Sequence, residues 1–184
     1  MAHQKATSVA GPEPGVVQPI PGNEEIALAE PHDIDGMLEL QAKNLFDRGG
    51  LLSVAFSRTF FEKAIADMPV IVARRNCCVI GYLRSSPLAV HAHVPIIEAM
   101  RRAYPGSADA YLYGPICVAE DERGRGLAGR LFAALRKKLP QREGILFIRR
   151  DNPASLRAHI KMGMRAVGEF THEGVAHAIL SYVG

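Results

Sequence analysis

The chain has 184 residues and a net charge of +3, and hydrophobic residues make up 48% of it. This is the length and composition of one globular domain with a buried core, and the charge is too small to indicate a nucleic-acid partner. No apolar run is long enough to span a membrane, the N-terminus lacks the apolar core of a secretory signal, and the three cysteines form no disulfide or zinc pattern. We therefore expect a cytoplasmic protein without a metal site.

The first 23 residues are rich in Pro, Gly, Ser and Ala and show little periodicity, which is typical of an extended or flexible arm. The alternative is an arm that packs on its own domain or on a partner subunit, as in a homodimer. We expect residues 24–184 to form a single domain.

The first half of this domain combines short apolar strands with amphipathic helices. In chain order we predict a strand at 26–29, a helix from 34 to about 46 with Asp33 as its N-cap, a helix at 58–67 capped by Ser57, a strand at 70–73, a turn at 74–76, and a strand at 77–83. Gly81 indicates a bulge or a close backbone approach, and residues 84–92 are predicted as a loop. Pro95 suits the first turn of a helix that ends at Ala103.

The second half begins with an apolar strand, Tyr111–Val118, followed by a glycine-containing loop and an amphipathic helix from Leu127 to Leu139 that Pro140 closes. The remaining predicted elements are a strand at 144–148, a helix at 152–162 with Gly163 as its C-cap, and two strands at 166–171 and 175–183. This order predicts a mixed central sheet flanked by helices.

The loop and helix start together carry the clearest chemical signal. Residues 123–129 read RGRGLAG, so several backbone N–H groups precede a helix with little side-chain obstruction. A helix N-terminus of this kind attracts phosphate, and Arg123 and Arg125 add positive charge. The segment is neither a P-loop nor a convincing dinucleotide motif. Its interpretation is a pyrophosphate site, and the alternative is a glycine-rich turn that only begins a helix.

Two motifs in the right order resemble the GCN5-related N-acetyltransferases. Arg123–Ala128 matches the R/Q-x-x-G-x-G/A loop of that family, and residues 152–164 are similar to its Asn-containing helix, here ending in Gly163-Met164 instead of Gly-Phe. The resemblance extends over roughly Ile26 to Tyr182. It implies an α/β (α+β) fold with a mixed, mostly antiparallel sheet of about seven strands, and acetyl-CoA as co-substrate. The residues that it assigns to the cofactor are Ile116, Cys117 and Val118, which resemble the strand that pairs with pantetheine, together with Arg123, Gly124, Arg125, Gly126, Leu127, Ala128, Gly129, Asn152 and Ser155.

The resemblance also indicates a catalytic residue. Many members of the family carry a Tyr seven residues after that Asn, and here the position is His159. A histidine, with a pKa of about 6.5, can donate a proton to a departing thiolate whose thiol has a pKa near 8.5. The alternative is a histidine on the helix surface. No general base is evident, although Glu120, Glu122, His91, His93 and Tyr113 are candidates.

The sequence thus predicts an acetyl-CoA-dependent N-acetyltransferase that acts on a primary amine of a small molecule or peptide by direct attack. Family members that acetylate ribosomal protein N-termini carry a Glu where this chain has Phe147, which disfavours that substrate class. A non-catalytic acyl-CoA-binding or regulatory module on the same fold is the alternative. A plain nucleotide-binding domain is a weaker one.

Overall fold

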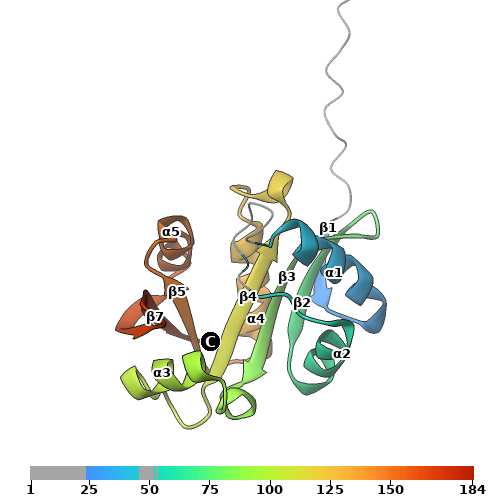
Figure 1. The fold of residues 1–184 in the computed structure, drawn as a ribbon. Helices are drawn as coiled ribbons and strands as arrows, with labels where there is room; N and C mark the ends of the chain where they lie inside the picture. Colours follow the sequence, from blue (N-terminus) through green and yellow to red (C-terminus); the bar gives the residue numbers. More distant parts are fainter. Residues whose placement is uncertain (1–23, 46–51, 53) are drawn as a thin grey trace, which may run out of the picture.

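The computed structural model describes residues 24–45, 52 and 54–184 (Figure 1). The predicted arm, 1–23, and the predicted end of the first helix near Phe46 lie outside the described residues. The elements are β1 (Glu24–Leu28), α1 (Ile34–Lys43), α2 (Arg58–Asp67), β2 (Val70–Arg75), β3 (Cys78–Pro87), α3 (Pro95–Ala103), β4 (Tyr111–Val118), α4 (Leu127–Lys138), β5 (Glu143–Arg149), α5 (Pro153–Lys161), β6 (Arg165–His172) and β7 (Val175–Val183), with short 3-10 turns η1 (Pro31–Asp33), η3 (Leu88–His91) and η4 (Glu120–Glu122).

The strands form one seven-stranded sheet in the order β1-β2-β3-β4-β5-β7-β6. All neighbouring strands are antiparallel except β4 and β5, which are parallel. This is the mixed, mostly antiparallel sheet flanked by helices that was expected, so the predicted fold class is confirmed.

Side chains on the two faces of the sheet pack against different helices. On one face, Val72, Tyr82 and Cys117 pack with residues of α1 and α2, and Leu112 packs with Ile97 and other residues of α3. On the opposite face, residues of β2, β3, β4, β5 and β7 pack with α4 and α5. Figure 1 shows α1, α2 and α3 in front of the sheet and α4 behind it. The strands of the sheet therefore separate two helical layers.

The central feature of the sheet is a fork between β4 and β5. These strands pair only at Tyr111–Gly144 and Leu112–Ile145 and then diverge, which gives the V visible in Figure 1. From Tyr113 onward, the edge of β4 that faces β5 has no partner strand among the described residues. Unpaired backbone groups on strand edges are ready to bond an extended ligand.

Three details differ from the sequence-based expectations. The predicted loop at 84–92 is wrong over its first part, because Ser85, Ser86 and Pro87 pair with β4. Arg74 and Arg75 belong to β2, so the hairpin turn is Asn76-Cys77, both with positive φ. Asp33 is the N-cap residue of α1 as predicted, but its side chain makes no capping hydrogen bond; its carboxylate accepts one from the Glu30 N–H (2.7 Å) and two from Arg74 instead.

Several local predictions are confirmed. Ser57 caps α2 by accepting a hydrogen bond from the Phe60 N–H, and Gly163 ends α5 with φ +95°. Gly81 lies at a bulge, and a Cβ there would come within 3.2 Å of Leu127 and Leu131, so a larger residue would push α4 off the sheet.

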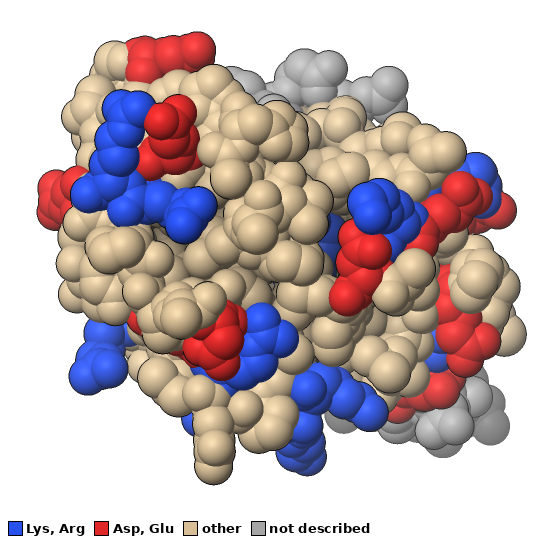
Figure 2. All heavy atoms as spheres, turned by 90° about the horizontal axis from the view of Figure 1, so that it is seen from below, with Lys and Arg blue, Asp and Glu red and all other residues tan. Residues whose placement is uncertain are grey.

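On the outside of the molecule, charges of both signs are interspersed over the face seen in Figure 2, with wide uncharged areas between them. Over the residues that the structure describes, no helix combines the length and the apolar character needed to cross a lipid bilayer.

Candidate functional site

The glycine loop forms an open start to α4. Gly124 and Gly126 have φ values of +75° and +78°, which a residue with a Cβ rarely adopts, and Gly126 is the N-cap of α4. A Cβ added to Gly124 or Gly129 would meet no atom within 4 Å, so space lies beside both. No side chain of the described residues caps the helix, and its first N–H groups therefore remain available to an anion.

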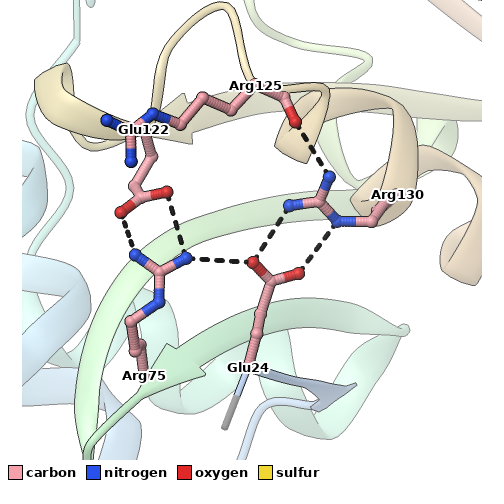
Figure 3. Close-up of polar contacts among 5 residues, drawn as sticks. All are labelled: Glu24, Arg75, Glu122, Arg125 and Arg130. Atoms are coloured by element: carbon pink, nitrogen blue, oxygen red, sulfur yellow. Dashed lines mark hydrogen bonds and ion pairs between the residues drawn. The ribbon is translucent and has the colours of Figure 1, made fainter. Parts of the chain in front are cut away.

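A set of ion pairs fixes this loop to the sheet (Figure 3). Both terminal nitrogens of Arg75 donate to the carboxylate of Glu122, which is only 3% exposed. Glu24 accepts from Arg75 (3.3 Å) and from two nitrogens of Arg130 (2.8 and 2.9 Å). Arg130 also donates to the Arg125 carbonyl at 2.9 Å. The loop is thus connected to β1, β2 and α4 through charged hydrogen bonds, which hold its backbone in position.

We expect Glu122→Gln to lower the free energy of unfolding by about 2 kcal/mol, because it leaves part of the Arg75 charge without its buried partner. Urea denaturation measures this loss. The matched control is Glu98→Gln, which breaks an exposed pair with Arg102 on α3 and should cost less than about 0.5 kcal/mol. Equal losses for the two variants would contradict a special role of Glu122 in holding the loop.

The helix α5 and its N-cap carry three other residues singled out from the sequence, Asn152, Ser155 and His159. Asn152 caps it by accepting a hydrogen bond from the Ser155 N–H at 3.1 Å. His159 is 5% exposed, so it is not a surface histidine, and its Nδ1 lies 2.8 Å from the Ser155 carbonyl. Because a carbonyl only accepts, Nδ1 carries the proton and Nε2 has the free lone pair. Burial lowers the pKa of His159, and the bond to Ser155 offsets this only in part, so the ring is mainly neutral at pH 7.

Tyr113 lies beside His159 at the start of the fork. The two rings meet edge to face with centroids 5.6 Å apart. The Tyr113 hydroxyl is buried and has no hydrogen-bond partner within the described part of the chain. Burial raises the pKa of Tyr113, so it keeps its proton at neutral pH. One group that holds a proton and one that can accept a proton therefore lie together at the base of the V.

Comparison with known proteins identifies the family of the chain. The model of the acetyltransferase (GNAT) family matches residues 38–164, which is more than half of the chain. The chain belongs to the acetyltransferase (GNAT) family. No match was found among curated proteins.

Solved GNAT structures share the fold of this GNAT chain at low sequence identity. An N-acetyltransferase from Staphylococcus aureus Mu50 is 19% identical with a TM-score of 0.65, covering 88% of this chain and 98% of that chain. A GNAT acetyltransferase from Streptococcus agalactiae 2603 is 15% identical with a TM-score of 0.68, covering 88% and 95%. A phosphinothricin acetyltransferase from Sinorhizobium meliloti, solved in complex with AcCoA, is 19% identical with a TM-score of 0.63, covering 87% and 88%.

Within this GNAT chain, the two arginines predicted to contact phosphate differ in their surroundings. Arg123 donates to the side-chain oxygen of Asn44, at the end of α1, and Asn44 in turn donates to the Leu40 carbonyl. The Arg123 side chain therefore already has a structural partner. Arg125 is exposed and shares in the ion-pair set only through its carbonyl, so its guanidinium is the one better placed to meet a bound anion.

The residues of this GNAT chain that were predicted to pair with the cofactor, Ile116, Cys117 and Val118, are at the diverging end of β4. Ile116 and Val118 pack toward α4, whereas Cys117 points to the layer of α1 and is 3% exposed. Burial raises the pKa of the Cys117 thiol to about 12, so no reactive thiolate is present at neutral pH. This argues against a covalent acyl-cysteine in the reaction.

The candidate bases separate into distinct groups. Glu122 is committed to Arg75, and Tyr113 holds its proton. Glu120 and His93 are exposed. His91 is half-buried in η3, with Nε2 3.0 Å from the Ser86 hydroxyl, and burial and then the nearby Arg84 lower its pKa. Among these candidates, His91 alone is both partly enclosed by the front helical layer and mainly unprotonated at pH 7.

Proposed function

We propose that this GNAT chain transfers an acetyl group from acetyl-CoA to a primary amine of a small molecule or peptide by direct attack. The observation that carries the proposal is the open, glycine-lined start of α4 beside the unpaired edge of β4. The GNAT family membership supports it. The structural neighbour from Sinorhizobium meliloti, which was solved with AcCoA, supports the choice of cofactor.

The residues of the loop suit the charged end of such a cofactor. The space beside Gly124 and Gly129 leaves their backbone free for close approach, and the first turn of α4 offers N–H groups to a pyrophosphate. The edge of β4 at Ile116–Val118 offers backbone groups to an extended amide chain, and Asn152 and Ser155 begin the helix on the other side of the fork. In this role the residues bind and orient; the bound co-substrate supplies an acetyl thioester.

The reaction requires that the amine nitrogen bonds to the acetyl carbon, that the carbon–sulfur bond breaks, and that a proton moves from the amine to the sulfur. Holding both reactants in the fork supplies much of the rate. We assign the proton on the sulfur side to the cationic form of His159, which carries it on Nε2 and is the minor form at pH 7, with the Tyr113 hydroxyl as a neighbouring hydrogen-bond donor. Because the Cys117 thiol is buried and protonated, we propose that no acyl-enzyme forms.

The test is turnover of acetyl-CoA by the full chain with a panel of amines, followed as free thiol released, together with calorimetric titration of acetyl-CoA. We expect micromolar binding and thiol release that depends on the amine added. Tight binding without any turnover would instead favour the non-catalytic acyl-CoA-binding module. A preference for ATP over CoA would favour the nucleotide-binding domain.

A further inference from the structure

Within the part of the chain that the structure describes, Arg84 is a buried cation without an anionic partner. It lies in β3 and is 4% exposed, and its Nε is buried with no hydrogen-bond partner. Over residues 24–45, 52 and 54–184, no carboxylate contacts it. Arg74 and Arg75, on the neighbouring strand, are by contrast each paired with carboxylates. A buried charge without a partner is costly, so its presence calls for a ligand or another compensating group.

The immediate neighbours of Arg84 are aromatic. Phe56 and Phe60 stack on each other with ring centroids 4.3 Å apart, and the guanidinium carbon of Arg84 lies 5.3 and 4.9 Å from these centroids. Aromatic faces attract a cation but accept no strong hydrogen bonds from it. Burial lowers the pKa of Arg84 only to about 10, so it remains charged at neutral pH. The rings thus hold the guanidinium in place, and within the described chain its Nε–H has no hydrogen-bond partner.

A second buried donor lies on the same face of β3. The Tyr82 hydroxyl is buried, and its close polar neighbour in the described chain is the Cys117 thiol, which is a weak hydrogen-bonding group. Arg84 and Tyr82 are alternate residues of one strand, so their side chains lie in the same layer, and both donors lack a strong hydrogen-bond acceptor there among the described residues. The same layer also holds Ser86 and His91.

The strand register places Arg84 next to the fork. Leu83 pairs with Ile116 and Ser85 pairs with Tyr113, so Arg84 lies across from Gly114-Pro115, where β4 has one extra residue. This point comes two to three residues after the last pair between β4 and β5. Arg84 faces the layer of α1, α2 and α3, whereas His159 and α4 lie on the opposite face. A molecule that reaches the fork from the front layer would thus meet Arg84.

We propose that Arg84, held by Phe56 and Phe60, binds the carboxylate of the acetyl acceptor, which is therefore a small amino acid-like amine. This inference rests on the proposed function. A guanidinium binds a carboxylate through two parallel hydrogen bonds, and such a pair is strongest where water is excluded. The bond would satisfy the buried charge and would fix the acceptor, so that its amine is held at a set distance from the carboxylate.

The first experiment compares L-amino acids with their primary amides as acceptors at saturating acetyl-CoA. For at least one side chain we expect kcat/KM to be about 100-fold higher for the acid than for its amide, the loss expected when a buried charged hydrogen bond is removed. Arg84→Met should abolish this preference by lowering the rate with the acid while the amide rate changes little. The matched control, Arg101→Met, removes an exposed arginine of α3 and should keep the preference.

Protein stability separates a binding role from a structural one. Replacing a buried, unpaired charge by an apolar side chain of similar length is often neutral or stabilising. We therefore expect the melting temperature of Arg84→Met to equal or exceed that of the wild type. A fall of several degrees with an unchanged acid preference would mean that Arg84 serves only to pack against Phe56 and Phe60, and would overturn the proposal.

A binding measurement keeps the two proposals separable. The melting temperature of the wild-type protein with CoA is measured in the presence of N-acetyl amino acids and of the corresponding amides. This measurement requires no turnover. If only the acids raise the melting temperature, and if Arg84→Met loses this effect, carboxylate binding by Arg84 is supported. This holds even if the protein acetylates no amine, and in that case only the proposed function fails. Equal rates for acids and amides in an active enzyme, or equal stabilisation by both probes, would overturn the role of Arg84.

Discussion

Gly126→Glu should abolish acetyl-CoA binding, raising the dissociation constant by at least about 100-fold. Gly126 is the N-cap of α4 with φ +78°, so its backbone lies at the positive end of the helix dipole. A Cβ at this position would meet the Arg130 guanidinium at 3.5 Å and direct its side chain over the helix start. A carboxylate there would repel phosphate and occupy the space that it needs. Calorimetric titration of acetyl-CoA measures the change.

Gly126→Gln is the matched control, because it adds the same bulk and the same backbone strain without the charge. We expect binding intermediate between the wild type and Gly126→Glu. Because residue 126 is exposed, both variants should keep the fold, which circular dichroism checks. Wild-type affinity in a folded Gly126→Glu protein would show that the pyrophosphate binds elsewhere.

His159→Ala should lower kcat by about 10²-fold with little change in acetyl-CoA affinity, which is the usual scale for a general acid. The acid form of His159 carries a proton on Nε2, and burial lowers the pKa of this group below its ordinary value of about 6.5. The protonated form therefore disappears as the pH rises through that lowered pKa. In steady-state kinetics, the kcat of the wild type should therefore fall toward that of His159→Ala as the pH rises through this pKa. His159→Tyr should restore part of the rate.

The lowered pKa of His159 also makes the free energy of unfolding depend on pH, whether or not the protein is active. Because the folded protein binds a proton at His159 less readily than the unfolded chain, the stability from this residue is present above about pH 6.5 and is lost as the pH falls below it. In urea titrations, His159→Ala should make the free energy of unfolding depend less on pH in this range.

Tyr113→Phe tests which residue is the proton donor. If His159→Ala kept the full kcat over pH 6–9 while Tyr113→Phe had a low kcat, the proton would be assigned to Tyr113 instead.

Local signals in the sequence are sufficient for much of the fold. Ser57 and Pro95 begin helices at the predicted positions, because capping and fixed φ act within a single turn. The end of β3 was missed for a different reason. Arg84, Ser85 and Ser86 are polar, and a pattern based on hydrophobicity assigns them to a loop, yet all three are buried in a paired strand. Polar residues inside a sheet are not recognisable without their long-range partners.

The site shows the same limit. The glycine loop and the Asn152 helix follow from local patterns and from resemblance to a family. The pair between Arg75 and Glu122 joins residues 47 positions apart, and the bond between Arg123 and Asn44 joins residues 79 apart, so neither has a signature in the sequence. Arg84 is similar, because nothing in its local sequence distinguishes a buried, unpaired arginine from an ordinary surface one.

The sparse pairing of β4 with β5 also bears on how the chain folds. Residues 24–118 build β1 to β4, and residues 143–183 build β5 to β7, so every antiparallel strand pair lies within one of two uninterrupted segments. Beyond the two residue pairs at the base of the fork, side-chain contacts join the segments. Ile97 and Met100 of α3 pack in one cluster with Ile179 of β7, and Glu143 accepts hydrogen bonds from the Tyr104 hydroxyl and the Ser107 N–H. During synthesis, the first segment has all its own strand partners before the second leaves the ribosome. The proposed binding site therefore lies along the junction between two pieces of sheet that are contiguous in sequence, β1–β4 and β5–β7.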